Sequence, residues 1–259
     1  MEGNPKSVVP LINFDSDERT IRLNDKLSIT HIESPELENL LEEITSDVTS
    51  YVNLLGAKYV IENRNITHSG KDEEDVVLAL RLLKPGDVLV LAAFYLDERN
   101  RVSLRIYEDL NRRILPSTEY FLKSRETTDL IELWKKVRHR TTKSHLEFPT
   151  YKFMESYENV WYEDKIVDYM VAFESLTFYK RNKAIQPAGE VIGIAAGMLL
   201  GKNHKERTKI KERMKTAYEL RNAKVHGNIE KLSKFENIKK LSMDVEDYLR
   251  KALRRLIRE

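Results

Sequence analysis

Three polar residues near the C-terminus, Arg221, Asn222 and His226, have types and spacing that suit chemistry on a phosphodiester. A histidine titrates close to neutral pH and can serve as a general base or acid, and an arginine can neutralise a phosphate. Together they suit attack of a ribose 2′-hydroxyl on its own phosphodiester, a reaction that needs no metal ion. Arg221 and His226 diverge by roughly 140° on an ideal helix, so one substrate would have to lie across the helix end.

The helix that must carry these residues has a signal at each end. Asn203 followed by Glu206 has the spacing of a capping box, and Gly227 is typical of the position just past a helix end. At about 100° per residue, Arg221 falls on the apolar stripe of this helix. The other members of the stripe are Ile210, Met214, Ala217 and Val225. We therefore expect the guanidinium group to face the core, where it needs a carboxylate or an anion.

Glu174 is the expected partner of Arg221. It is the only charged residue between Tyr169 and Tyr179, so its surroundings should be apolar. We expect Glu174 to pair with Arg221 and orient it, and we assign a supporting role to Tyr218. Two plainer interpretations stay open: the pair is a structural ion pair, and His226 is a cation that closes a helix C-terminus.

Basic residues crowd the same helix and favour a polyanion as partner. Binding of an RNA backbone is assigned to Lys205, Lys209, Lys211, Arg213, Lys215 and Lys224. The alternative is a solvated helix face, which alternating charges usually form. A second basic group, interpreted as solvated, consists of Arg250, Lys251, Arg254, Arg255 and Arg258.

The second half of the chain is predicted to be helical almost throughout. Apolar residues at three- and four-residue steps predict helices over 164–179, 187–200, 205–225 and 229–257. Short turns would join them into an up-and-down bundle. Four glycines, at positions 189, 193, 197 and 201, recur at every fourth residue of the second helix. We interpret them as a face that another backbone approaches closely, rather than as a ligand loop.

Two segments of this half resemble a HEPN domain, in particular the Apea-like HEPN group. They are AFESL, which begins at residue 172, and MKTAYELRNAKVHGN, residues 214–228. The signature of that family is an arginine, a polar residue, a few further residues and a histidine, often followed by glycine. Arg221, Asn222, His226 and Gly227 match it in order. The resemblance covers only the C-terminal half.

The resemblance implies a fold, an activity and partners. Many HEPN domains are metal-independent endoribonucleases in toxin, antiphage or RNA-processing settings, with active sites where two motifs face each other across a dimer. It implies that Arg221 and His226 are catalytic, that Asn222 gives polar support and that the chain forms a homodimer acting on RNA. An antitoxin or regulatory protein is a candidate partner. Other members are inactive, so the alternative is a noncatalytic HEPN-type module that dimerises and binds nucleic acid or protein.

The first half is predicted to be an α+β accessory domain over residues 1–142, followed by the all-α HEPN-type bundle over 143–259. Acidic residues outnumber basic ones before this junction, and basic residues outnumber acidic ones after it. The expected elements are a helix from Ser34 to Gly56, a strand at 58–62, a helix at 72–83, a hairpin of 88–96 with 102–107, and a helix at 127–140. We find no catalytic constellation in this half.

Composition excludes several classes of protein. The chain has 259 residues and no cysteine, which removes disulfides, thiolate metal sites and thiol chemistry. The histidines lack paired metal-ligand spacing, and no phosphate-binding loop is present, so no metal and no cofactor are expected. No apolar run reaches the roughly 20 residues of a membrane span, and no signal peptide is visible, so we expect a cytoplasmic protein without membrane contact.

Overall fold

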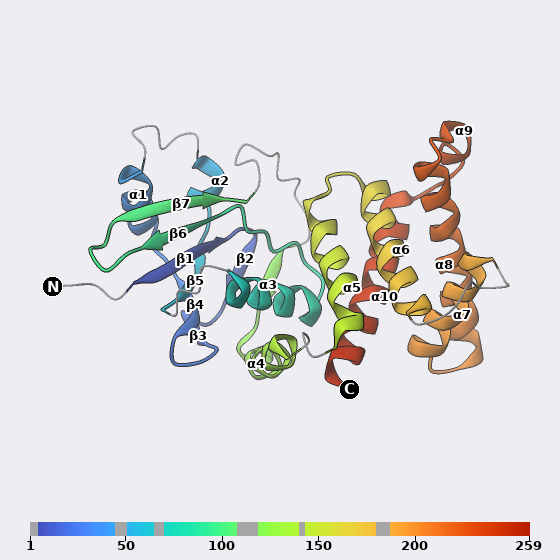
Figure 1. The fold of residues 1–259 in the computed structure, drawn as a ribbon, viewed down its shortest axis with the longest axis horizontal. Helices are drawn as coiled ribbons and strands as arrows, with labels where there is room; N and C mark the ends of the chain where they lie inside the picture. Colours follow the sequence, from blue (N-terminus) through green and yellow to red (C-terminus); the bar gives the residue numbers. More distant parts are fainter. Residues whose placement is uncertain (1–4, 45–50, 65–69, 108–118, 140–142, 180–186) are drawn as a thin grey trace. The chain divides into compact units, whose positions relative to one another are not determined.

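The computed structural model describes residues 5–44, 51–64, 70–107, 119–139, 143–179 and 187–259. The chain divides into two compact units, Met1–Arg138 and His139–Glu259, called the N-terminal unit and the C-terminal unit below. The first is built around an antiparallel sheet and the second is helical (Figure 1). The predicted junction after residue 142 lies close to this division, but residues 140–142 themselves lie outside the described residues.

The N-terminal unit contains a sheet of six strands in the order β3-β4-β5-β1-β6-β7, with every neighbouring pair antiparallel. The strands are β1 Lys6–Leu11, β3 Thr20–Arg22, β4 Leu27–His31, β5 Tyr59–Asn63, β6 Ala92–Leu96 and β7 Val102–Ile106. A separate parallel pair joins β2 Phe14–Ser16 to β8 Tyr120–Leu122. Strand β1 lies inside the sheet, and its residues from Ser7 onward are buried, as expected for a strand covered on both faces.

The sequence predicted some elements of this unit well. The hairpin of β6 and β7 is confirmed, with Leu96 opposite Val102, although β6 begins only at Ala92. The expected strand at 58–62 corresponds to β5, and the expected helices at 72–83 and 127–140 correspond to α3 Lys71–Leu83 and α4 Ser124–Arg138. Strands β1 to β4 were not predicted.

The single helix expected from Ser34 to Gly56 is wrong. Helix α1 Ser34–Glu42 is followed by a turn, and α2 Val52–Leu55 is a separate short helix; residues 45–50 lie outside the described part. At the end of α1 the amide of Ile44 bonds to the carbonyl of Leu41, a three-residue step that tightens the last turn. The N-cap residue of α1 is Glu33, so Ser34, whose type also suits a cap, is the first helical residue.

The C-terminal unit consists of helices joined by short connections. They are α5 Ser144–Glu155, the 3₁₀ turn η3 Ser156–Glu158, α6 Tyr162–Phe178, α7 Ala188–Leu200, α8 His204–Val225, α9 Ile229–Leu232 and α10 Ile238–Arg258. Helix α5 was not predicted. The other helices lie where the sequence predicts them, except at 229–257, where one long helix was expected. There the chain forms α9 and α10, separated by residues 233–237. Asn237, the N-cap residue of α10, has a left-handed φ of 52°, which a continuous helix cannot contain.

The backbones of α7 and α8 approach each other along the four predicted glycines. A Cβ atom added to Gly193 would lie 2.8 Å from the carbonyl oxygen of Lys211, and one added to Gly197 would lie 2.8 Å from that of Arg207. Real Cβ atoms do not come that close to a backbone oxygen. The glycine face is therefore a packing surface, as predicted, and it holds α8 in place.

Replacement of Gly193 by alanine tests this contact. Alanine favours a helix by about 1 kcal/mol over glycine, so an open site would be stabilised by Gly193→Ala. We expect the opposite, a loss of about 1–3 kcal/mol in the free energy of unfolding, because the added methyl group overpacks the contact. Urea unfolding followed by circular dichroism measures it. Ile194→Ala, on the exposed side of α7, is the matched control, and a stabilised Gly193→Ala would contradict the prediction.

Candidate functional site

Helix α8 is capped at both ends as the sequence predicts. The Asn203 side chain accepts a hydrogen bond from the amide of Glu206 at 2.9 Å, and the Glu206 carboxylate accepts one from the amide of Lys202 at 2.8 Å. At the other end Gly227 is left-handed, with a φ of 65°. Its amide bonds to the carbonyl of Lys224, and the next amide bonds to that of Ala223, which is the Schellman pattern. Both caps fix the register of the residues between them.

Arg221 lies in a cluster of the predicted supporting residues. Its Nη2 lies 3.4 Å from Oε2 of Glu174 on α6, and its Nη1 donates to Oδ1 of Asn222 at 3.0 Å. The guanidinium carbon lies 5.7 Å from the centroid of the Tyr218 ring. The side chains of Arg221 and Glu174 are 21% and 24% exposed, so the pair is largely but not fully withdrawn from water.

The guanidinium group is only partly satisfied. Within the described part of the chain, Nε of Arg221 is buried and has no hydrogen-bond partner, while the Nη atoms contact Glu174 and Asn222. A buried donor without a partner costs about 1–3 kcal/mol. An anion that reached this group after a rotation of the side chain would remove that cost, so the arginine has unused capacity for a ligand.

Tyr218 stays protonated near neutral pH. Burial raises its pKa, and the nearby Glu174 carboxylate raises it further against the opposing charge of Arg221. Its hydroxyl group can therefore act as a donor beside Glu174. The cluster thus combines a cation, a carboxylate, an amide and a neutral phenol around one partly buried position.

His226 lies apart from this cluster. It occupies the C-cap position of α8, and its side chain is exposed. Across the described ranges, no hydrogen bond or ion pair engages its imidazole, and none joins it to Arg221. The structure therefore brings together Glu174, Tyr218, Arg221 and Asn222, and it leaves the histidine free at the helix end.

Most of the cations expected to bind RNA have acidic partners in the chain. Glu190 on α7 bonds to Lys211 and Lys215, Asp244 on α10 bonds to Arg213, and Asp164 on α6 bonds to Lys224 at 3.0 Å. Lys205 and Lys209 are exposed, and among the described residues neither has an acidic partner. Only these two of the six assigned residues offer a full positive charge to a ligand.

Arg250 corrects the expectation of a solvated basic group. It is 3% exposed and pairs with Glu246, which also accepts a hydrogen bond from Tyr157 at 2.9 Å. Burial alone would lower the pKa of Arg250, but Tyr157 and Glu246 reverse that effect and raise it. Arg250 therefore forms a buried ion pair within α10, and Tyr157 of η3 bonds to the same carboxylate. The spacing of Glu246 and Arg250, four residues apart, allowed this pair to be predicted, but not its burial.

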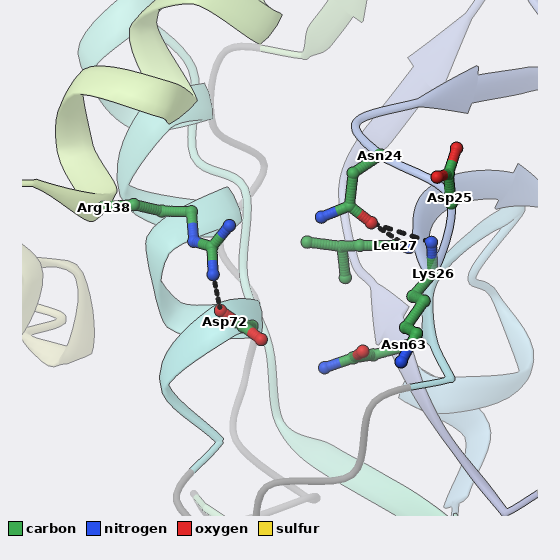
Figure 2. A pocket seen from close by; sticks show the side chains of 7 residues that line it. All are labelled: Asn24, Asp25, Lys26, Leu27, Asn63, Asp72 and Arg138. Carbon is green, nitrogen blue, oxygen red and sulfur yellow. Dashed lines mark hydrogen bonds and ion pairs between the residues drawn. The ribbon is translucent and has the colours of Figure 1, made fainter.

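A polar cavity of about 230 Å³ lies in the N-terminal unit. Figure 2 shows Arg138 and Asp72, 3.3 Å apart, on one side of it, opposite Asn24 and Asn63. Asn63 is buried and donates to the carboxylate of Glu73 at 3.1 Å. Cations, carboxylates and amides are mixed on its walls, so the lining does not select one reaction, and sequence analysis had assigned nothing here.

A second cavity, of about 330 Å³, lies in the C-terminal unit and is acidic. Its lining is Glu155, Glu158, Asn159, Asp164, Val167 and Asp168. Burial raises the pKa of Asp168, although Lys152 lies 3.1 Å away and Asn159 donates to it at 2.6 Å. Carboxylates repel phosphates, so this cavity marks a part of the surface that a nucleic acid backbone avoids.

Searches for related proteins leave the site to be interpreted from its geometry. Comparison of the chain with models of known protein families, with curated proteins and with solved structures found no match. In the described segments, no group of three or more histidine, aspartate or glutamate side chains is arranged to hold a metal ion. No helix in those segments is long and apolar enough to cross a membrane.

A double-mutant cycle tests the pair of Glu174 and Arg221. We expect Glu174→Gln and Arg221→Met to show a coupling of about 0.5–2 kcal/mol in the free energy of unfolding, because each partner leaves the other partly buried and unpaired. Chemical denaturation of the four proteins measures it. Glu230 and Lys234 form an exposed pair that should show no measurable coupling. Independent effects of Glu174→Gln and Arg221→Met would show that the contact does not orient the arginine.

Proposed function

We propose that the C-terminal unit is a HEPN-type helical bundle that acts as a metal-independent endoribonuclease. The observation that supports this most directly is that Arg221 is held in one orientation but is only partly hydrogen-bonded. A network from two helices orients it, yet Nε has no partner within the described residues, while an exposed histidine lies five residues away. An oriented cation with an unused donor and an exposed imidazole on the same helix suit a phosphodiester substrate, provided that one substrate can reach both.

The proposed reaction is an internal transfer at phosphorus. His226 removes the proton of a ribose 2′-hydroxyl, whose oxygen attacks the adjacent phosphorus atom. The bond to the 5′-oxygen of the next nucleotide breaks, and that oxygen takes up the proton that His226 carries, directly or through water. The products are a 2′,3′-cyclic phosphate and a 5′-hydroxyl end. Arg221 neutralises the charge that builds on the phosphate oxygens. Asn222, Glu174 and Tyr218 position the guanidinium group.

A homodimer would complete the site. Arg221 contacts Glu174 on α6, whereas His226 is exposed at the end of α8, and no hydrogen bond joins the two side chains in the described residues. A second copy would set the histidine of one chain near the arginine of the other, across one scissile phosphate. In the same proposal, the N-terminal unit is an accessory domain, and an antitoxin or regulatory protein is a candidate partner of the chain.

One observation favours the second candidate, a noncatalytic module that dimerises and binds nucleic acid or protein. Arg221 has a carboxylate partner in its own chain, and acids within the chain neutralise Lys211, Arg213, Lys215 and Lys224. These are the features of a fold held together by ion pairs. The two candidates differ in whether RNA is cut.

Cleavage of an end-labelled RNA of mixed sequence tests the ribonuclease. We expect cutting that resists EDTA and yields 2′,3′-cyclic phosphate ends. Because a positioned acid or base contributes about 10²–10⁴-fold, His226→Ala should reduce the rate by that factor with an unchanged circular dichroism spectrum. Val225→Ala, at the neighbouring exposed position, is the control and should cut normally.

Cutting that persists in His226→Ala, or that EDTA abolishes, would refute the proposed mechanism. RNA binding without cutting by both the wild type and His226→Ala would favour the noncatalytic module. Gel electrophoresis for cutting and fluorescence anisotropy for binding separate these results.

The contrast between paired and free cations makes a second prediction. Lys209 and Arg213 lie one turn apart on α8, but within the described ranges only Arg213 has an acidic partner, Asp244, at 2.8 Å. Each phosphate contact to a single strand adds about 0.7 to the slope of log affinity against log salt. We expect Lys209→Gln to lower that slope by about 0.7. Arg213→Gln should leave it unchanged, since Lys240 still neutralises Asp244. Equal slopes for both variants would contradict this assignment.

A further inference from the structure

Trp161 is an exposed aromatic side chain that neither the motif nor the basic residues account for. It is the N-cap residue of α6, and it is 68% exposed. In the described part of the chain, its indole ring makes no hydrogen bond and no contact with another aromatic ring. Trp134, the only other tryptophan of the sequence, is 2% exposed in the N-terminal unit. A large exposed indole carries a cost in water that a ligand would remove.

The start of α6 lies at the same end of the C-terminal unit as the end of α8 (Figure 1). Asp164, one turn into α6, bonds to Lys224 at 3.0 Å, and Lys224 lies two residues before His226. The ion pair thus joins the turn that follows Trp161 to the turn that precedes the histidine. Trp161 is therefore exposed at the end of the helices that carries the proposed general base.

An exposed lysine, Lys239, lies near the start of α6. Lys239, at the start of α10, has its Nζ 5.8 Å from the ring centroid of Tyr162, the residue after Trp161. Lys239 is exposed and, among the described residues, has no acidic partner. The acids nearby are Glu163, in the first turn of α6, and Asp164, which Lys224 neutralises. The contact of Lys239 is with Tyr162, the neighbour of Trp161 in the sequence. Aromatic side chains near an exposed ammonium group are the usual composition of a surface for single-stranded nucleic acid.

We propose that Trp161 stacks on a nucleobase of the RNA strand near the bond that His226 cuts, and that Lys239 contacts a neighbouring phosphate. This inference rests on the proposed function, which identifies the bound strand as RNA. Stacking requires a base that is free of a duplex, so the substrate is single-stranded at this position. Glu158, which lines the acidic cavity, disfavours a phosphate there, whereas the exposed Lys239 favours one.

The test measures binding without cleavage. A 2′-O-methyl RNA oligonucleotide has no free 2′-hydroxyl, so it binds but is not cut. Titration of the full chain with it should quench tryptophan emission, and Trp161→Phe should remove that quenching because only buried Trp134 remains. By anisotropy of a labelled oligonucleotide, Trp161→Ala should weaken binding about 5- to 150-fold, whereas Trp161→Phe should stay close to the wild type. Tyr151→Ala, at an aromatic residue 58% exposed on α5, is the control.

The outcomes separate the two proposals. Quenching of Trp161 with no cleavage of ordinary RNA would support the stacking surface and refute the ribonuclease. Cleavage by the proposed chemistry, with neither quenching nor weaker binding by Trp161→Ala, would refute the stacking surface and leave the ribonuclease standing. Emission that shifts to shorter wavelength as the protein is concentrated without RNA would assign the indole to a protein contact and overturn the proposal.

Discussion

The close backbone contact between α7 and α8 is the constraint on which the C-terminal unit depends. Glycines at four successive helical turns allow the two helices to approach until added Cβ atoms would collide with carbonyl oxygens and side chains of α8. Helix α8 carries the arginine, the histidine and most of the basic residues, so this contact sets where all of them lie. Glu190, the only charged residue of α7, adds ion pairs to Lys211 and Lys215 on the same helix.

The two main residues of the candidate site differ, because Arg221 is held in one orientation whereas His226 is exposed. Two caps fix the length and register of α8, and Glu174, Tyr218 and Asn222 fix the orientation of Arg221. His226 follows the last helical turn and is exposed. Interactions within one chain therefore position the cation, whereas the proposed base depends on what meets the helix end. In the proposed ribonuclease, a second copy of the chain would complete this site.

Local chemistry explains what the sequence could predict. Asn203 and Gly227 act within a few residues, and the charge of Glu174 in an apolar segment requires a partner, so the helix ends and the pair with Arg221 were predictable. The break between α9 and α10 was not, because apolar residues continue at helical spacing through it. The pairing of Arg213 depends on Asp244 of another helix, a contact that only the fold creates, and the burial of Arg250 depends on the packing around α10. Strands β2 and β3 have three residues each, too few for a periodic signal.

The link between Glu190 and its two lysines makes the packing of α7 sensitive to acid. Hydrogen bonds from Lys211 and Lys215 lower the pKa of Glu190, so the folded unit holds a proton at this position less readily than the unfolded chain does. This stabilisation is complete above the pKa of glutamate in the unfolded chain and disappears as the pH falls through the lower value of the folded state. Protonation of Glu190 in acid therefore destabilises the C-terminal unit, because it removes the carboxylate charge that pairs α7 with α8.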